Sequence, residues 1–269
     1  MIYDADTWIG HWPFRSLPRR SAGDLLRQMD KHGIEKALVA SLHGLFYTDA
    51  HEANHELARE IRRYRDRLVP CAILNPTYYG WQQDLKQCRE EFGMPVLRMV
   101  PDYHGYRLSD PCAAEMAAAA QSLNMLVALI WRIVDPRGRH RLDPGREANI
   151  DEVHAFVRKF PHERFLLLNF PRTLSRLRFE RPACFYDMNL FVGKNGLRLE
   201  EEVKRHGAER FVFGSTMLLR YGWPARLALE KCPLSRRERE MIQWKNLARL
   251  VPEMAPSATP PGAPSRGKA

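Results

Sequence analysis

Asp4 and Asp6 are the residues of this chain whose types and spacing point most directly to chemistry. They stand two residues apart in the first apolar segment, MIYDADTWIG. Side chains two apart on a β-strand share a face, and neighbouring carboxylates raise each other's proton affinity, so one can stay protonated while the other accepts a proton. The pair therefore predicts an acid–base site on the first strand. The alternative is that Asp4 hydrogen-bonds the backbone and only Asp6 reaches a site.

Arginines recur at or just beyond the carboxyl ends of the expected strands, where guanidinium groups suit recognition of a carboxylate or phosphate through paired hydrogen bonds. They are Arg15, Arg98, Arg132, Arg172 and Arg220. We assign substrate binding first to Arg98 and Arg132, because their strands place them deepest. Arg15 and Arg172 are included in the expected binding set. The alternative for the group is a ring of solvated surface side chains.

Other polar residues near strand ends complete the expected lining of the site. Asn75, Asn169 and Asp187 are assigned to substrate binding, and Thr216 is assigned to catalysis. Barrel enzymes carry their chemistry at the carboxyl ends of their strands, which is the position predicted for these four side chains.

Histidines offer two possible metal sites. His51 to His55 reads HEANH, which matches the zinc-binding pattern HExxH, but both histidines lie opposite the apolar stripe of their helix and are expected to face solvent. His11, His43 and His104 each follow a strand and could converge on a metal. The simpler interpretation of these three is that they are solvent-exposed loop residues.

Composition favours one large domain in a reducing compartment. The chain has 269 residues, of which 45% are hydrophobic, and α/β barrels of this length form single domains. Its five cysteines are widely spaced and include no CxxC pair, so we expect neither disulfides nor a cysteine zinc site. No signal-like opening and no apolar run of membrane-spanning length occur, so we expect a cytoplasmic protein without a membrane partner.

The net charge of +10 raises the question of a polyanionic partner. The basic residues are dispersed and mostly interleaved with Asp or Glu, and no nucleic-acid-binding motif accompanies them. We therefore expect a small anionic molecule as the partner and no nucleic acid.

Strand-like and helix-like segments alternate along the chain. Continuous apolar runs predict eight buried strands, at Ile2–Asp6, Lys36–Ser41, Val69–Leu74, Val96–Val100, Leu126–Trp131, Phe165–Phe170, Cys184–Leu190 and Arg210–Phe213. Capping patterns mark helices between them, as at Ser21 with Asp24 and at Ser235 with Glu238. This alternation predicts a (β/α)₈ barrel over residues 1–251 and a disordered Pro/Ala-rich tail over residues 252–269.

The order of these segments resembles the amidohydrolase-related barrels of the metal-dependent hydrolase superfamily, from Met1 to about Val251. MIYDADTWIG resembles the opening strand of that family, GIEKALVAS and LVPCAILNP its second and third strands, and RFVFGST with WKNLARLV its last strand and closing helix. The resemblance implies a (β/α)₈ barrel whose active members hydrolyse amide or ester bonds, or decarboxylate, at a metal held at the C-terminal mouth.

The chain departs from that family at the metal ligands. Asp6 and Trp8 stand where the family has its first-strand His-x-His pair, and Trp131, Asn169 and Thr216 stand where it has two further histidines and an aspartate. Zinc needs three or four converging donors, and Asp6 alone cannot supply them. We therefore expect no metal and no other cofactor. Trp131 is placed in the lining of the site, with the alternative that it is a packing residue filling the volume of a metal.

These observations predict a metal-independent hydrolase or carbon–carbon lyase that acts on a small anionic substrate. Asp4 or Asp6 would be the general acid or base, and Arg98 or Arg132 would hold a carboxylate. Two alternatives stay open: a catalytically inactive barrel that binds a ligand or partner, and a metal hydrolase with relocated histidine ligands. The possibility of a homo-oligomer is also left open.

Overall fold

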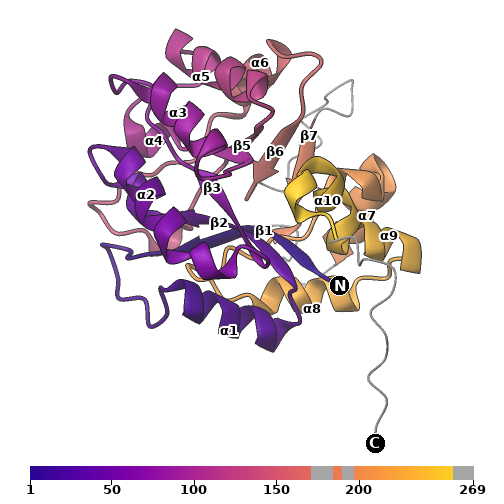
Figure 1. Ribbon diagram of the computed structural model, residues 1–269. Helices are drawn as coiled ribbons and strands as arrows, with labels where there is room; N and C mark the ends of the chain where they lie inside the picture. Colours follow the sequence, from indigo (N-terminus) through magenta and orange to yellow (C-terminus); the bar gives the residue numbers. More distant parts are fainter. Residues whose placement is uncertain (171–183, 190–196, 257–269) are drawn as a thin grey trace, which may run out of the picture.

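A barrel of eight parallel strands forms the centre of the molecule (Figure 1). The computed structural model describes residues 1–170, 184–189 and 197–256. The strands follow one another around the barrel in sequence order: β1 (Tyr3–Ile9), β2 (Lys36–Ser41), β3 (Leu68–Ala72), β4 (Val96–Met99), β5 (Leu126–Ile130), β6 (Phe165–Leu168), β7 (Cys184–Asp187) and β8 (Phe211–Val212). This order and the alternation with helices confirm the predicted (β/α)₈ barrel.

The barrel is nearly closed between β1 and the residues that end and follow β8. The amide of Ala5 donates to the carbonyl of Phe213 over 2.9 Å, and the amide of Thr216 donates to the carbonyl of Asp6 over 2.7 Å. These hydrogen bonds bring the first and last strand ends together.

The strands are apolar on both faces because both faces are covered. On β5, Leu126, Ala128 and Ile130 belong to the hydrophobic cluster that fills the barrel. Val127 and Leu129 belong to the cluster between the barrel and the surrounding helices. The continuous apolar runs of the sequence follow from this double burial.

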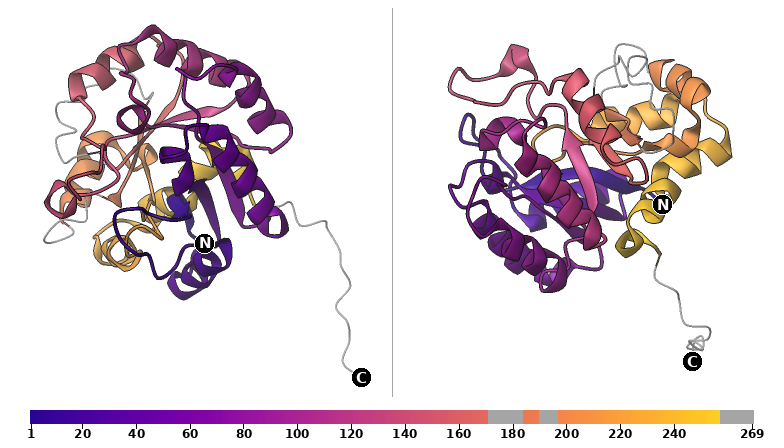
Figure 2. Two further views of the ribbon diagram at one scale, coloured as in Figure 1. Left: turned by 90° about the vertical axis from the view of Figure 1, so that its left-hand side faces the viewer. Right: turned by 90° about the horizontal axis from the view of Figure 1, so that it is seen from above.

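Helices surround the strands (Figure 2). The α-helices of the described residues are α1 (Ala22–His32), α2 (Ala50–Glu60), α3 (Trp81–Glu90), α4 (Pro101–His104), α5 (Pro111–Ser122), α6 (Ile150–Arg158), α7 (Leu197–His206), α8 (Trp223–Lys231), α9 (Arg236–Glu240) and α10 (Asn246–Leu250). A π-helical turn over Met241–Lys245 joins α9 to α10. None of the described helices has the length and apolar character needed to cross a membrane.

The capping patterns predicted helix ends well where side chains make the cap. The capping boxes at Ser21 and Ser235 are both present. Helix α6 begins after Asn149, whose side chain accepts from the amide of Asp151. Helix α8 begins without such a pattern, because its N-cap Gly222 makes no side-chain hydrogen bond.

The chain continues to pack on the barrel beyond residue 251. Pro252–Met254 forms a short 3₁₀ helix, and Met254 is fully buried. Glu253 pairs with Arg89 of α3 over 2.6 Å. Residues 252–256, which the sequence assigned to the tail, are therefore part of the fold, and the rest of that segment lies outside the described residues.

Strand β1 contains an irregularity that decides where its polar side chains point. Its register with β2 shifts between Asp4 and Thr7: Asp4 is paired with Ala37, while Thr7 is paired with Val39. Three steps along β1 therefore match two along β2, and such an extra residue breaks the strict alternation of faces.

Candidate functional site

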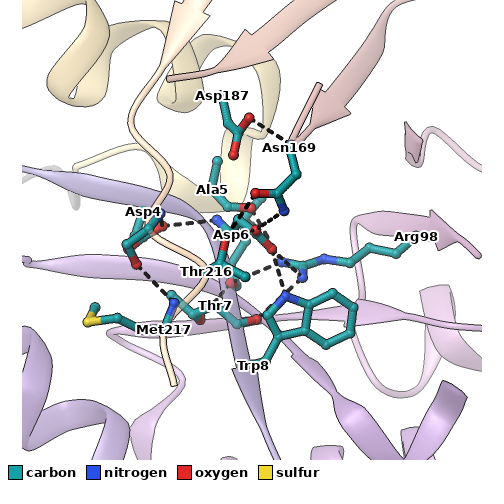
Figure 3. Close-up of polar contacts among 12 residues, drawn as sticks. Asp4, Ala5, Asp6, Thr7, Trp8, Arg98, Asn169, Asp187, Thr216 and Met217 are labelled. Atoms are coloured by element: carbon teal, nitrogen blue, oxygen red, sulfur yellow. Dashed lines mark hydrogen bonds and ion pairs between the residues drawn. The ribbon is translucent and has the colours of Figure 1, made fainter. Parts of the chain in front are cut away.

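The carboxylate of Asp6 is the centre of a buried polar cluster inside the barrel (Figure 3). Its Oδ1 accepts from Trp8 Nε1 over 2.9 Å and from Arg98 Nη1 over 3.0 Å. Its Oδ2 accepts from Asn169 Nδ2 over 2.9 Å and from Thr216 Oγ1 over 2.8 Å. A carboxylate offers about four lone-pair positions. The chain itself uses all of those of Asp6.

Arg98 lies inside the barrel on β4 and is fully buried. Besides Asp6, its Nη1 contacts the carbonyl of Thr7 over 3.3 Å, and its Nη2 contacts the carbonyls of Ala5 and Leu38, each over 3.3 Å. Its guanidinium carbon lies 4.6 Å from the centre of the Trp8 ring. The guanidinium predicted to hold a substrate carboxylate therefore binds a carboxylate of the chain.

Asn169 and Thr216 bring strained backbone to the cluster. Their φ angles are +56° and +58°, and each follows the end of its strand. A β-branched residue is rarely found in this left-handed region, and such strain persists only where surrounding contacts hold it. The hydrogen bonds of both side chains to Asp6 are contacts of that kind.

Asp187, at the end of β7, keeps one carboxyl oxygen without a hydrogen-bond partner among the described residues. Its Oδ1 accepts from the amide of Asn169 over 2.8 Å, while its Oδ2 is buried and unpaired. Burial, followed by the nearby charge of Asp6, raises the pKa of Asp187 well above its ordinary value. A carboxyl group with one oxygen that has no partner can give a proton in its acid form and take one in its carboxylate form.

Asp4 is also fully buried but binds a different part of the chain. It accepts from the amide and hydroxyl of Ser215 and from the amide of Asp6, the last over 3.0 Å. Burial raises the pKa of Asp4 to about 7. Asp4 therefore binds the segment after β8 through Ser215. Asp6 is the carboxylate of the pair that binds Arg98 and Asn169. This arrangement corresponds to the structural alternative weighed for Asp4.

A cleft of about 1140 Å³ lies beside the cluster, lined by segments that follow β1, β5, β7 and β8, by part of α1 and by the start of α8. Its lining includes six basic side chains, namely Arg15, Arg19, Lys31, Arg132, Arg137 and Arg220. Asp135 is the one carboxylate among the described lining residues, and it already pairs with Arg132 and Arg137. This excess of positive charge suits an anionic ligand.

Asn189 connects the cleft to the buried cluster. It lines the cleft, and its Nδ2 donates to Asn169 Oδ1 over 2.8 Å and to Thr216 Oγ1 over 2.5 Å. Asn169 and Thr216 in turn hold Asp6. A ligand in the cleft would therefore meet a side chain that the Asp6 cluster orients.

The structure brings together some of the expected site residues and separates others. Asp6, Asn169, Asp187 and Thr216 meet in the buried cluster with Arg98, and Arg15 and Arg132 line the cleft. Asn75 caps its own loop by accepting from Thr77. Trp131 packs on Phe170 in the cluster between barrel and helices, away from the barrel interior. Arg172 lies outside the described residues.

Asn189 and Ser215 contact the candidate site residues but carry no role in the sequence-based prediction. Asn189 stands two residues after Asp187, and the two-residue periodicity of a strand could have suggested it. Ser215 directly precedes Thr216 and had no comparable signal.

The histidines take different positions: His51 is buried against expectation, whereas His11 is exposed, as the simpler interpretation predicted. His51 is buried between α2 and α3, where it contacts Gln87 over 2.8 Å and stacks on Phe92, because α2 packs more of its surface than its aliphatic stripe indicated. His11 and His43 meet through ring nitrogens 3.2 Å apart. His104 Nε2 contacts the carbonyl of Gly44 over 2.8 Å instead.

No protein-family model matches this chain, and no curated protein matches it. Among solved structures it is similar to 5-carboxyvanillate decarboxylase from Sphingomonas paucimobilis, with 13% identity over 93% of this chain and 98% of that chain and a TM-score of 0.73. It is also similar to a probable 2-pyrone-4,6-dicarboxylic acid hydrolase from Acinetobacter baumannii, with 12% identity over 93% and 98% of the chains and a TM-score of 0.66. A third is 5-carboxyvanillate decarboxylase from Novosphingobium aromaticivorans with bound manganese, with 13% identity over 93% and 96% of the chains and a TM-score of 0.69. These neighbours are amidohydrolase-superfamily barrels, and at such identities the likeness concerns the fold.

The residues of this chain do not fit a metal ion inside the barrel. Among the described residues, no group of three or more His, Cys, Asp or Glu side chains is arranged to hold one. Both oxygens of Asp6 are already engaged by donors of the chain, and one of these donors, Arg98, is itself a cation. A metal would have to displace that guanidinium.

Proposed function

We propose that this protein is a hydrolase or carbon–carbon lyase that acts, without a metal, on a small anionic substrate bound in the cleft. One observation carries the proposal: the basic cleft adjoins a buried carboxyl cluster, and Asn189 lies in both. The names of two structural neighbours, a carboxyvanillate decarboxylase and a pyrone-dicarboxylic acid hydrolase, refer to small carboxylated molecules. We propose a substrate of this coarse class and no specific compound.

Within this proposal Asp187 is the acid–base group. Its Oδ2 has no hydrogen-bond partner among the described residues and its pKa is raised, so it can exchange a proton with a substrate, whereas the oxygens of Asp6 are occupied by four donors. Asp6 and Thr216 have a supporting role in this proposal, because their hydrogen bonds hold the side chains of Asn169 and Asn189 in place. Asp4 is a further buried carboxyl with an exchangeable proton, but it contacts Ser215, whereas Asp187 contacts Asn169, which accepts from Asn189 in the cleft lining.

The arginines of the cleft bind the substrate anion. Arg132 and Arg220 are both partly buried, and Arg220 is fixed by a hydrogen bond from its Nη2 to the carbonyl of Ile133 over 2.9 Å. Its pKa is lowered mainly by burial, which also reduces the competition of water for a bound carboxylate.

The test is a calorimetric binding screen of small mono- and dicarboxylic acids, each against its neutral amide, followed by NMR detection of turnover. We expect acids to bind more tightly than their amides, and the R220M variant to lose roughly tenfold in affinity, as for a hydrogen bond to a charged group. The D187N variant should bind within a few-fold of wild type but lose at least roughly 100-fold in turnover. The matched control is R237A, which removes an exposed arginine of α9. Equal binding of acids and amides, or full turnover by D187N, would contradict the proposal.

A non-catalytic binding barrel is the second candidate, and one observation favours it. Asp6, Asn169, Asp187 and Thr216 are all at most 1% exposed. A cluster so enclosed can serve as structural support for a ligand-binding cleft. Tight binding of acids that are never converted, by wild type and D187N alike, is the outcome expected for this candidate.

A further inference from the structure

Arg98 is the only lysine or arginine among the described residues whose side chain is buried. Burying an isolated charge is costly, so such a group persists only when it is paired and hydrogen-bonded. The groups that stabilise the buried guanidinium come from two strands. The carboxylate of Asp6 and the ring of Trp8 come from β1, and the carbonyls come from β1 and β2.

The surroundings of the guanidinium have the composition of a cation-binding site. One carboxylate oxygen of Asp6 and the carbonyl oxygens of Ala5, Thr7 and Leu38 contact its two terminal nitrogens at 3.0–3.3 Å. The ring of Trp8 covers it at a distance suited to a cation–π contact. All the polar partners are acceptors, and the site is closed to solvent.

We propose that Arg98 is a built-in cation, a side chain occupying an internal cation site that the protein would otherwise have to fill with a ligand. The manganese of one structural neighbour and the poor fit of this chain to a metal are consistent with this assignment. If the side chain is removed, the remaining site should select a guanidinium ion, because its acceptors are arranged around a planar cation.

The built-in cation also acts as a positioning residue, and this half of the proposal rests on the proposed function. Arg98 and Trp8 hold Asp6 Oδ1, and Asp6 Oδ2 holds Asn169 and Thr216, which both accept from Asn189 in the cleft. Arg98 thus orients, through two intermediate residues, a side chain that a bound substrate would contact.

The experiment removes the Arg98 side chain and measures whether added cations of different chemistry restore the melting temperature. In R98A, ethylguanidinium replaces the missing atoms one for one. We expect R98A to lower the melting temperature by roughly 10 °C, as for a broken buried ion pair in a chain of this size. Ethylguanidinium at ten times its Kd should restore roughly 3–6 °C. Manganese, zinc and ethylammonium at the same concentration should restore none of the loss.

Wild type and R237A are the controls for nonspecific effects of the added ions, and neither should gain stability from ethylguanidinium. An equal gain in R237A, or a larger gain of R98A with manganese than with ethylguanidinium, would overturn the assignment.

A second set of variants keeps the proposal testable if R98A does not fold. R98M leaves Asp6 buried without its cation, whereas the D6N and R98M double variant removes both charges. We expect the double variant to melt at a higher temperature than R98M alone, because an uncompensated buried charge costs more than a neutral pair. A double variant that melts at or below R98M would refute the pairing.

The positioning role has its own readout, in R98K. Lysine keeps the charge but cannot span Asp6 and the three carbonyls with a planar fork. We expect kcat to fall at least roughly tenfold in R98K while KM changes little, because the arginines that bind the substrate are untouched. A raised KM with an unchanged kcat in R98K would contradict the positioning role of Arg98. If wild type shows no turnover at all, the proposed function fails, and the melting experiments still decide whether Arg98 is a built-in cation.

Discussion

Burial raises the pKa of two carboxyl groups in this barrel, Asp4 and Asp187, and the physical cause is the same for both: the charged form would lie in a closed, apolar interior. Ser215 opposes the effect at Asp4 by donating to the charged form. Asp6 is equally buried, and four donors of the chain surround its carboxylate.

The raised pKa of Asp4 predicts a pH dependence of stability. A carboxyl with a higher pKa in the folded than in the unfolded protein stabilises the fold below its unfolded pKa and loses that contribution as pH rises through the folded pKa. For Asp4 this window extends from 3.8 to about 7. Its contribution is at most about 4 kcal/mol. We expect the wild-type melting temperature to fall between pH 4 and pH 8, in calorimetric scans, and the fall to be smaller in D4N.

Asp24 provides a control of opposite sign. Hydrogen bonds at the start of α1 hold the pKa of Asp24 below its ordinary value. Its contribution is therefore present above the unfolded pKa and is lost as pH falls through the folded pKa, so D24N should lose stability near neutral pH and little in strong acid. Identical pH profiles for wild type and D4N would show that Asp4 does not titrate as stated.

At the scale of elements, β7 and the residues that follow β8 pack closely where Gly214 lies against Asp187. A side chain at Gly214 would place its Cβ 2.9 Å from the Cβ of Asp187. Asp187 is fully buried and binds the amide of Asn169, so it has little room to move. The absence of a side chain at position 214 therefore allows the carboxyl of Asp187 to lie next to β8.

This close approach predicts that G214A disturbs the site. The added methyl must push β8 or Asp187 outward, and we expect a loss of about 1–3 kcal/mol in unfolding free energy measured with urea. Turnover should fall with it, since Asp187 would move. The control is G138A, because a Cβ at Gly138 has no atom within 4 Å. Equal unfolding free energies for the two variants would show that the backbone at residue 214 and Asp187 can move apart without loss of stability.

At the scale of the whole molecule, the chain carries a net charge of +10, and six of its lysine and arginine side chains line the cleft beside the buried cluster. Charges that line a concave surface reinforce one another and attract anions over a distance that salt shortens. Several basic residues outside the cleft pair with acidic neighbours on the surface, as Arg67 does with Asp30 and Lys204 with Glu200. Such exposed pairs contribute little.

The cleft therefore predicts salt-sensitive binding. We expect the affinity for a dicarboxylate that binds in the screen to fall at least roughly tenfold between low salt and 0.5 M sodium chloride, and more steeply than the affinity for a matched monocarboxylate. Titration calorimetry at several salt concentrations measures both slopes. The R132M and R220M variants should each reduce the slope, and a salt-independent affinity would place the ligand elsewhere.

The sequence by itself determined the elements and the general position of the site. Local rules were sufficient for this: apolar runs covered on both faces gave the strands, and Ser21 and Ser235 capped their helices. Asp6, Asn169, Asp187 and Thr216 could be named because each lies on or just after a strand, and the carboxyl ends of parallel strands converge in any such barrel.

Only the tertiary structure decided which of these groups meet. Arg98 and Asp6 are 92 residues apart, and their pairing depends on barrel closure and on the shifted register of β1, neither of which leaves a local signal. The same shift separates Asp4 from Asp6, although strict alternation would have put them on one face. The basic cleft is formed by loops and a helix whose arginines are far apart in the chain. The physical reason is that hydrophobic periodicity and capping act over a few residues, whereas pairing of a buried charge is a property of the closed interior that must accommodate it.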